Sequence, residues 1–375
     1  MSKEIKIVAV GDLCVNREDP DTIFDLVRDE IKKADFAFGQ IETTYSTRGA
    51  VNPSGTYLTL RADPKNVGGV ARAGFNIASF ASNHCMDYGV DALLDTVSHF
   101  ESNGVRVIGA GNNLMEARKP LIVEKNGTKI GWLAYCSILH PRYWADTDRA
   151  GCAPARARTL YETLEIDQPG TPPRILTYPN DDDLAAILSD IAALKKVTDV
   201  VMVSMHWGLH FKEAEIAMYE RTYGHLCIDG GADVILGHHA HILKPIEIYK
   251  GKPIFYCLSN FAFDVAYPEN EWDKPERVER RSRLNPTWKN VDPKYKTFPF
   301  PVDSRKSILV DIVCEDKKVK RVSWKPVMIN ENSQPRCLRR SEPEFDEVVN
   351  YMTRITRDQK LMTEYPVTGD EIILI

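Results

Sequence analysis

The sequence predicts an α/β fold in which the central strands run parallel. Short apolar runs that are typical of β-strands recur along the chain, and segments with helical spacing lie between several of them. This alternation is typical of parallel sheets, because each helix carries the chain back across the face of the sheet. In such folds ligands bind at the carboxyl ends of the strands. The polar residues that follow each run are therefore candidates for a functional site.

Five apolar runs form the predicted strands, and each leads directly into polar side chains. They are IKIVAV before Gly11-Asp12, DFAFGQ before Ile41-Glu42, FNIASFAS before Asn83-His84, DVVMVSM before His206-Trp207-Gly208, and ADVILG before His238-His239-Ala240-His241. The segments with helical spacing are residues 20–33, 88–103, 181–196 and 214–230. Because the carboxyl ends of parallel strands meet at one edge of a sheet, we expect the five polar clusters to meet there.

Two regions between these elements are less regular. Residues 137–173 predict a loop-rich insertion near the mouth of the site, because proline, glycine and charged residues dominate them. Residues 268–301 predict a long surface excursion, and long structureless loops often act as lids. Its arginines Arg277, Arg280 and Arg281 are candidates for binding an anionic substrate, although a solvated charge run is the favoured explanation for them.

The C-terminal part predicts strands and one helix. Residues 244–260 indicate two strands around Lys250-Gly251, with Asn260 at the end of the second strand and near the site. Residues 307–313 and 321–327 predict a hairpin, and residues 343–358 predict a closing helix. We expect one catalytic domain over residues 1–330, and over residues 331–375 a segment that closes the same domain.

Composition excludes several classes of protein. The 48 basic and 53 acidic residues give a net charge of −5, so no general attraction to nucleic acid or anionic lipid is expected. The start of the chain, MSKEIKIVAVGD, lacks the features of a secretory signal, and no segment approaches the ~20 apolar residues of a membrane span. Eight cysteines occur without a CxxC pair. We expect a cytoplasmic protein without a membrane partner.

The side chains after the five runs suit divalent metal ions. Mixed carboxylate, amide and imidazole ligands bind Zn²⁺, Mn²⁺ or Fe²⁺, and a bridging carboxylate can hold two ions about 3.5–4 Å apart. Each residue alone has an ordinary explanation as a turn, a cap or a hydrogen-bonded core residue. Their joint occurrence at five strand ends favours a metal site. The candidates are Asp12, Glu42, Asn83, His84, His206, His238, His239 and His241.

Several of these motifs resemble those of the CapA-like family, the poly-γ-glutamate capsule synthesis proteins, which are similar to metallophosphoesterases. The motifs are GDLCVNR, QIETT, SFASNHCMDYG, MHWG and GADVILGHHAHILKPIEIYKGKPIFYCLSNFAFD, in the expected order over residues 5–265. Two departures are Gln40-Ile41-Glu42 for Asn-Leu-Glu and Ser259-Asn260-Phe261 for Gly-Asn-Phe. The resemblance implies a metallophosphoesterase-like sandwich of mixed sheets flanked by helices, with two divalent ions (Mn, Zn or Fe) at the carboxyl ends of the strands.

The resemblance also implies individual roles. Asp12 corresponds to the first metal ligand, Glu42 to the bridging carboxylate, and Asn83 and His206 to further ligands. His84 corresponds to the catalytic histidine that contacts the leaving group, and Asp12 is counted with it at the catalytic centre. The final pair of ligands is His239 and His241, with His238 as an alternative to His239. Two positions differ: Cys14 replaces a histidine ligand, and His210 stands where the family often has glutamate.

The function implied is hydrolysis of a phosphoester of a small anionic substrate by metal-activated water. A γ-glutamyl amide as substrate, a metal-dependent lyase, and a non-catalytic role in poly-γ-glutamate synthesis remain as alternatives. A homo-oligomer is compatible with each of them. The residues expected to bind the substrate are Arg17, His140, Arg142, Arg156, His210, His238 and Asn260.

Overall fold

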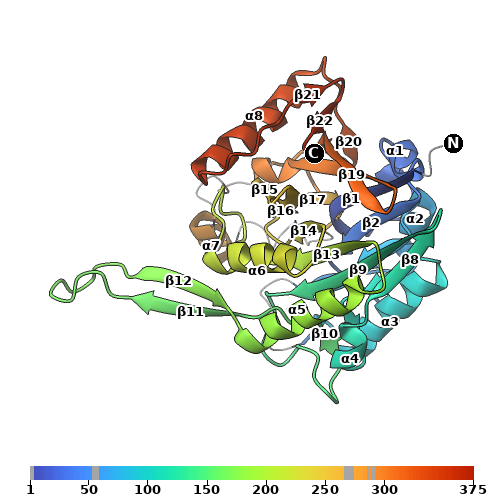
Figure 1. Ribbon diagram of the computed structural model, residues 1–375. Helices are drawn as coiled ribbons and strands as arrows, with labels where there is room; N and C mark the ends of the chain where they lie inside the picture. The colour runs from blue at the N-terminus through green and yellow to red at the C-terminus, as the bar shows by residue number, and fades with distance from the viewer. Residues whose placement is uncertain (1–3, 53–58, 266–273, 285–287, 289–291) are drawn as a thin grey trace.

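Two facing β-sheets with helices on their outer sides form the body of the protein (Figure 1). The computed structural model describes residues 4–52, 59–265, 274–284, 288 and 292–375. Both sheets contain parallel and antiparallel pairs. The predicted α/β sandwich of mixed sheets is therefore confirmed. Among the described residues, no helix has the length and apolar character needed to cross a membrane.

The first sheet joins the N-terminal strands to the C-terminal ones. Its order is β21-β22-β19-β18-β1-β2-β5-β6, with β17 beside β1 and β20 beside β19. The strands β2, β17, β5 and β6 extend the sheet in parallel, whereas the β18–β22 half is antiparallel. The bounds are β1 (Ile5–Cys14), β2 (Phe36–Ile41), β5 (Ile77–Ser79), β6 (Arg106–Ile108), β17 (Asn260–Phe263), β18 (Lys306–Glu315), β19 (Lys318–Ile329), β20 (Pro335–Cys337), β21 (Val367–Thr368) and β22 (Glu371–Ile373).

The second sheet has the order β15-β16-β14-β13-β9-β8, with parallel strands in its centre and an antiparallel strand at each margin. The bounds are β8 (Leu121–Lys125), β9 (Thr128–Cys136), β13 (Val200–His206), β14 (Val234–His238), β15 (Ile246–Tyr249) and β16 (Lys252–Phe255). The central strands are buried throughout, as expected for parallel strands that are covered on both faces.

Helices cover the outer faces. α3 packs on the first sheet, α5 and α6 pack on the second, and α8 packs against β19. The bounds are α1 (Arg28–Lys32), α2 (Asn66–Ala73), α3 (Gly89–Ser102), α4 (Leu114–Ala117), α5 (Asp181–Lys195), α6 (Met218–Asp229), α7 (Pro275–Leu284) and α8 (Pro343–Asp358). Short strands β3 (Thr44–Tyr45), β4 (Arg61–Ala62), β7 (Ala110–Gly111) and β10 (Gly151–Cys152) line the connections.

Aromatic and branched side chains fill the space between the sheets. Phe38 of β2 stacks on Trp132 of β9 with ring centroids 5.1 Å apart, and both side chains are fully buried. The same apolar cluster includes residues from both sheets and from α3 and α8. Each such side chain contributes about 1.5–3 kcal/mol by leaving water, so this layer fixes the two sheets against each other.

The structure corrects three expectations about individual elements. Instead of one helix over residues 20–33, the chain forms a 3-10 turn (Thr22–Phe24) and the five-residue α1. The insertion after residue 137 is not only loop: β11 (Ala157–Glu162) and β12 (Arg174–Pro179) form a hairpin that projects far from the body (Figure 1). The second strand of the 244–260 segment ends at Phe255, so Asn260 begins β17.

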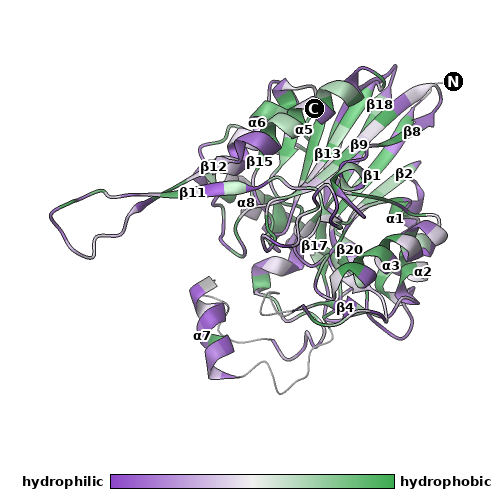
Figure 2. Cartoon of the chain, turned by 90° about the horizontal axis from the view of Figure 1, so that it is seen from below, coloured by the Kyte–Doolittle hydropathy of each residue, from purple (hydrophilic) through white to green (hydrophobic). Residues whose placement is uncertain are grey.

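The excursion over residues 268–301 contains α7, whose charged residues give it a hydrophilic surface beside the body (Figure 2). Residues 268–273, 285–287 and 289–291 lie outside the described residues. The described remainder includes Trp288, which is buried against Phe211 and Phe300. The sequence had suggested a structureless excursion, but its described residues include a helix and a buried tryptophan.

Candidate metal centre

The five polar clusters meet at one place, where the carboxyl ends of strands from both sheets converge. Asp12 lies in β1, Glu42 follows β2, His206 ends β13 and His238 ends β14. All four side chains are fully buried. The two sheets therefore direct their strand ends into a common interior site. The clusters meet as predicted, but they come from two facing sheets and not from one edge of a single sheet.

The first ligand group gathers Asn83, His206 and His239 around Glu42. The Asn83 Oδ1 atom lies 2.6 Å from His206 Nε2 and 3.1 Å from His239 Nδ1, and these two nitrogens are 3.2 Å apart. The Glu42 Oε1 atom lies 3.6 Å from His206 Nε2. Ligand atoms that share an ion at about 2.0–2.2 Å must lie roughly 3 Å from one another. These four side chains have that spacing.

The second ligand group consists of Asp12, Glu42 and His241, whose ligand atoms all lie within 4.8 Å of one another. His241 Nδ1 is 3.4 Å from Asp12 Oδ2, and its Nε2 is 3.8 Å from Glu42 Oε1. Glu42 belongs to both groups. A carboxylate common to two groups of ligands is the arrangement that places two ions side by side.

Burial and charge explain why these residues suit cations. Glu42 Oε1 and Asp12 Oδ2 are buried oxygens without a hydrogen-bond donor among the described residues. Burial raises the pKa of Glu42 well above its usual value, and the neighbouring Asp12 carboxylate raises that pKa further. Two ionised carboxylates in a buried site are costly unless a cation lies between them. The donor set therefore fits divalent ions.

The histidines are held in the state that binds a metal. Burial lowers the pKa of His206 and of His239 well below the ordinary value, and neighbouring histidines lower both pKa values further. A neutral imidazole offers a lone pair to an ion, whereas a protonated one does not. Both rings therefore have free lone pairs at neutral pH.

The turn after β14 separates the three clustered histidines by their backbone conformation. His239 and His241 have φ values of +90° and +55°, which are unusual for residues with a side chain. Such strain persists where the surrounding structure requires it, often at functional sites. His238 instead ends β14, with its ring 5.9 Å from that of Phe38 and its Nδ1 3.2 Å from Asp12 Oδ1. The geometry thus groups His239, and not His238, with Glu42 and His206.

A glycine allows Asn260 to approach Asp12. A Cβ atom on Gly11 would lie 1.9 Å from the Ser259 carbonyl oxygen, so only glycine permits this contact. Asp12 and Asn260 are register partners in the parallel β1–β17 pair. Asn260 Oδ1 lies 2.8 Å from His241 Nδ1, which orients that ring. Asn260 thus lies beside the second ligand group.

His84 has a buried carboxylate partner that sequence reasoning missed. Its Nδ1 lies 2.7 Å from Asp87 Oδ2, and Asp87 also accepts a hydrogen bond from the Leu60 backbone. Ser82, also missed, donates to Glu42 Oε2 at 2.8 Å. The spacing His84-x-x-Asp87 was the available signal, because a carboxylate three residues on can bond the ring nitrogen. Asp87 fixes His84 so that its Nε2 is left for other partners.

An aromatic wall surrounds the second ligand group. His210 stacks on His239 with centroids 3.8 Å apart, and its Nε2 has no hydrogen-bond partner among the described residues. Phe211, Phe263 and Phe300 have ring centroids between 5.3 and 5.6 Å from that of His241. These apolar rings exclude water from one side of the ligand group, and no motif in the sequence pointed to them.

Several predicted substrate-binding cations are already paired. Arg17 makes a bidentate ion pair with the buried Asp264, at 2.7 and 2.8 Å. Arg156 pairs in the same way with Asp183. His140 packs on Tyr143, and Arg142 is exposed. The arrangement therefore gives Arg17 and Arg156 a structural partner in place of a substrate anion.

Two further side chains bear on the centre. Cys14 donates its thiol to the Asp264 carbonyl at 3.1 Å, and burial raises its pKa well above the usual value. A neutral thiol directed at a carbonyl supplies no ligand to the second group. Burial lowers the pKa of His210 well below its usual value, the neighbouring His241 and His84 lower it further, and the charge of Arg280 in α7 makes the smallest contribution. α7 thus brings positive charge toward the histidines.

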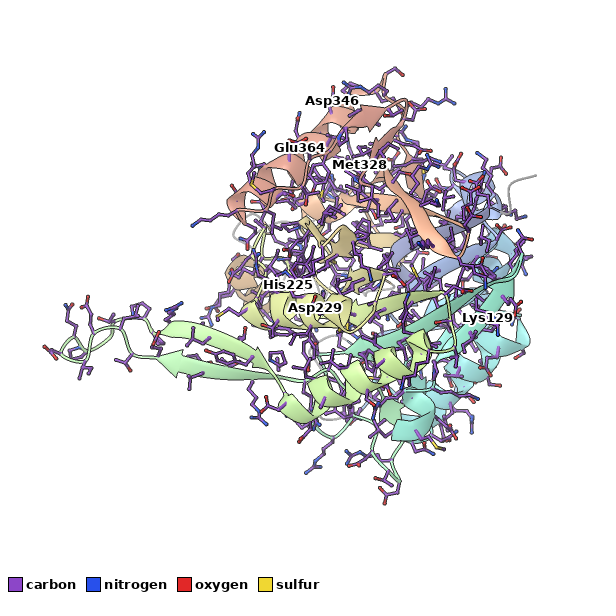
Figure 3. The ribbon with its side chains drawn as sticks, viewed as in Figure 1. Lys129, His225, Asp229, Met328, Asp346 and Glu364 are labelled. Atoms are coloured by element: carbon purple, nitrogen blue, oxygen red, sulfur yellow. The ribbon has the colours of Figure 1, made fainter. Side chains whose placement is uncertain are left out.

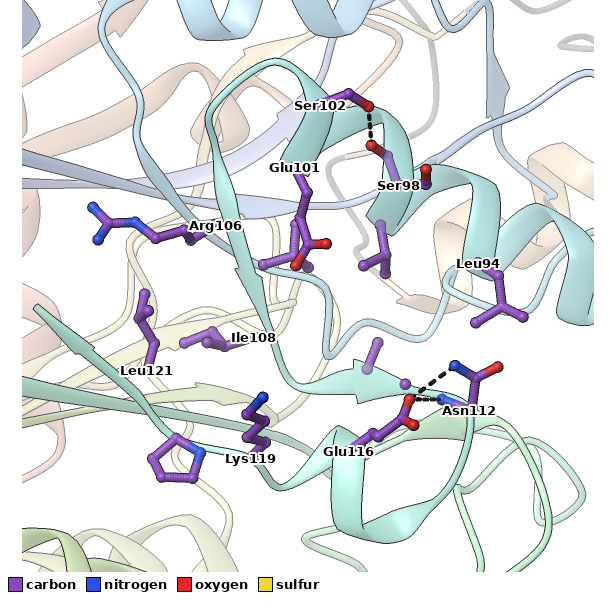
Figure 4. A pocket seen from close by; sticks show the side chains of 15 residues that line it. Leu94, Ser98, Glu101, Ser102, Arg106, Ile108, Asn112, Glu116, Lys119 and Leu121 are labelled. Carbon is purple, nitrogen blue, oxygen red and sulfur yellow. Dashed lines mark hydrogen bonds between the residues drawn. The ribbon is translucent and has the colours of Figure 1, made fainter.

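A separate groove of about 700 Å³ lies between α3, α4 and the marginal strands β6 and β8 (Figure 4). Arg106, Lys119, Glu101 and Glu116 line it. It contains none of the predicted site residues. Its positive and negative side chains offset each other, so it does not share the character of the metal centre.

Comparison with known proteins places the chain among capsule synthesis proteins. It is 28% identical over 267 residues to "PGA biosynthesis protein CapA" of Bacillus subtilis (strain 168), which covers 69% of this chain and 63% of that protein. It is 32% identical over 203 residues to a "Probable polyglutamine synthesis accessory protein" of Mycobacterium tuberculosis (strain ATCC 25618 / H37Rv), which covers 53% of this chain and 48% of that protein. The chain thus spans less than two thirds of the length of these relatives.

A solved structure similar to this one is the calcineurin-like phosphoesterase YfkN from Bacillus subtilis, with 14% identity and a TM-score of 0.42 over 96% of this chain and 98% of that chain. The sequence model described as "Bacterial capsule synthesis protein PGA_cap" matches residues 6–265, which is more than half of the chain. These residues include every member of both ligand groups. The protein therefore belongs to the bacterial capsule synthesis protein family, PGA_cap.

Proposed function

We propose that the protein is a metal-dependent hydrolase that cleaves a phosphoester of a small anionic substrate. The observation that carries this proposal is the sharing of Glu42 by two groups of buried ligand atoms. Asn83, His206 and His239 would hold one ion with Glu42, and Asp12 and His241 would hold the other. When bound, such a pair of divalent ions polarises a phosphoryl oxygen and lowers the pKa of a water molecule.

His84 assists the leaving group in this proposal. Its Nδ1 is held by Asp87 at 2.7 Å, which fixes the ring and leaves Nε2 to contact the leaving oxygen. Proton transfer by a positioned side chain of this kind contributes typically about 10²–10⁴-fold to the rate. Because His84 belongs to neither ligand group, its contribution is separable from metal binding.

The substrate is small and anionic in this proposal because the surroundings of the centre combine aromatic surface with positive charge. Phe211 and Phe300 form the apolar side, and Arg280 brings a guanidinium toward His210. Asn260 and His210 are polar side chains that contact histidines of the ligand groups, and they are our candidates for contacts with the substrate.

The names of the relatives favour a second candidate. One is a PGA biosynthesis protein and another a synthesis accessory protein, so the same centre in this chain would act on a γ-glutamyl amide or support synthesis without catalysis. The chain's own ligand atoms favour catalysis, because a scaffold gains nothing from strained histidines around buried carboxylates.

A paired screen tests these candidates. Protein purified in Mn²⁺ is assayed against a panel of phosphoesters and a panel of γ-glutamyl amides, with the variants Glu42→Gln and His84→Ala alongside. We expect phosphoester hydrolysis that both variants lose. Cleavage of amides alone would replace the proposal with the second enzyme function. If metal-loaded protein turns over neither panel, both enzyme functions are rejected and the non-catalytic accessory role remains.

A further inference from the structure

The β11–β12 arm exposes an unusual amount of apolar surface for a monomer. It extends from the body with its side chains directed into solvent (Figure 3). Tyr161 is 66% exposed, Ile175 60% and Leu160 55%, and every residue of β11 is exposed. Tyr161 and its register partner Ile175 share one face of the arm, and Leu160 lies on the other. An isolated two-stranded hairpin is marginally stable in water, and large exposed apolar side chains on it make the arm a candidate interaction surface.

The outer edge of β11 has a free set of backbone groups. Among the described residues, β11 pairs with β12 and with no other strand. The Asn180 amide donates to the Arg156 carbonyl, in register with the hairpin. Because hydrogen-bonded pairs alternate along an antiparallel ladder, the even-numbered residues of β11 bond β12. The amides and carbonyls of Thr159 and Tyr161 then face outward, which is an open template for another strand.

We propose that β11 pairs with β11 of a second copy of this chain, antiparallel and across a two-fold axis at Leu160. A strand that pairs antiparallel with its own copy satisfies two-fold symmetry, and each contact then occurs twice. In this register, Thr159 exchanges backbone hydrogen bonds with the partner's Tyr161. Leu160 lies opposite the partner's Leu160 at a non-hydrogen-bonded position, where side chains approach most closely.

Charge complementarity selects this register. It places Arg158 opposite the partner's Glu162 and Glu162 opposite the partner's Arg158. Shifting the axis to Thr159 or to Tyr161 places Arg158 or Glu162 opposite leucine instead. Within one chain Arg158 pairs with Asp181 and Glu162 with Arg174, but all four side chains are largely exposed. These pairs are weak and leave both charges available to the partner.

β12 is the poorer edge for pairing. Its Thr177 hydroxyl accepts a hydrogen bond from the Tyr219 amide of α6, and Leu176 is buried. Self-pairing of β12 about Leu176 would also place Arg174 opposite the uncharged Tyr178. The free edge, the apolar surface and the complementary charges therefore all belong to β11.

A charge-swap series measured by sedimentation equilibrium on the full chain tests the proposal. The wild type is expected to be a dimer. Arg158→Glu and Glu162→Arg are each expected to raise the dimer Kd by roughly tenfold, because each creates two like-charged pairs across the interface. The double variant restores opposite charges between copies and is expected to recover dimerisation. Within one chain the double variant makes the Arg158–Asp181 and Glu162–Arg174 pairs repulsive. If the single variants act only by disturbing the arm itself, the double variant should therefore be worse than either.

Cross-linking provides an independent readout. Leu160→Cys is expected to form a disulfide-linked dimer on mild oxidation, because the two copies meet at that position, whereas Ile175→Cys on β12 is expected to stay monomeric in denaturing electrophoresis. Metal content and turnover serve as folding controls, because the arm contributes no ligand to the centre. A monomeric wild type, a double variant as weak as the single variants, or equal cross-linking at positions 160 and 175 would overturn the proposal.

Discussion

The two ligand groups at the metal centre share Glu42, but they differ in how closely their atoms are gathered. In the group with Asn83, His206 and His239, the distances between neighbouring ligand atoms of these three residues are 2.6 to 3.2 Å. In the group with Asp12 and His241, His241 Nδ1 lies 3.4 Å from Asp12 Oδ2. The distance to the shared Glu42 Oε1 is similar in the two groups, at 3.6 Å from His206 Nε2 and 3.8 Å from His241 Nε2. The first group has four ligand side chains, with three of their ligand atoms within 3.2 Å of one another. The second group has only three ligand side chains.

Local sequence explains the difference. Cys14 stands at the position where the resemblance implied a histidine ligand. Its thiol donates to the Asp264 carbonyl instead. Asn260 approaches the second group, but its Oδ1 bonds His241 Nδ1. We therefore expect the first group to bind its ion more tightly, and the second ion to depend more on substrate or solvent to complete its ligands.

The largest effect should come from Glu42→Gln, because Glu42 serves both groups. We expect the affinity for both ions to fall by at least about a hundredfold, since loss of a mere outer partner of a ligand already costs 10–100-fold. Elemental analysis after dialysis measures this directly. Glu124→Gln, an exposed carboxylate on β8, is the matched control and should retain both ions. Retention of one full equivalent by Glu42→Gln would show that Glu42 serves a single ion.

The next largest effects should separate the two groups. His206→Ala is expected to lose the tighter ion, and His241→Ala is expected to lose the weaker one, because each removes one imidazole from one group. Calorimetric titration of each variant with Mn²⁺ should therefore leave one binding step, which is weak for His206→Ala and tight for His241→Ala. His225→Ala on α6, which bonds Glu247, is the control (Figure 3). The same remaining step in both variants would remove the distinction between the groups.

His84→Ala should lower kcat by about 10²–10⁴-fold and leave metal content unchanged, because His84 belongs to neither group. Asp87→Asn is the positioning variant, since Asp87 holds the ring of His84. It should lower kcat less than His84→Ala does and also leave the metal in place. Loss of metal by His84→Ala, to the extent seen for His241→Ala, would place His84 among the ligands.

The smallest effect concerns α7. Arg280→Ala should raise KM a few-fold with kcat and metal content unchanged, because Arg280 brings charge toward His210 without contributing a ligand. Arg283→Ala, whose side chain is exposed and paired with Glu279, is the matched control. If both variants have the KM of the wild type, α7 has no part in substrate binding.

The sequence predicted those features of the site that are determined by residues close together in the chain. Apolar periodicity predicted the strand ends that carry Asp12, Glu42, Asn83, His206 and the His238–His241 turn. It did not predict that these ends belong to two facing sheets, because the pairing of strands depends on distant segments. Apolar periodicity also predicted the strands on either side of Lys250-Gly251, since both signals lie within a few residues.

Contacts between distant segments could not be predicted in this way. Arg17 was expected to bind substrate, but it pairs with Asp264, 247 residues away. The aromatic wall of Phe211, Phe263 and Phe300 likewise comes from separate segments. The helix expected over residues 20–33 became a 3-10 turn and a short helix, and an exposed hairpin arose within a segment whose composition indicated a loop.

Titration of chelator-stripped wild-type protein with Mn²⁺ by calorimetry tests the central claim most directly, because it reports the number of ions and their affinities together. We expect two equivalents in two resolved steps, with the tighter step absent in His206→Ala and both steps absent in Glu42→Gln. A single equivalent in the wild type, or two equivalents that survive Glu42→Gln, would contradict a centre built on a carboxylate shared by two unequal ligand groups.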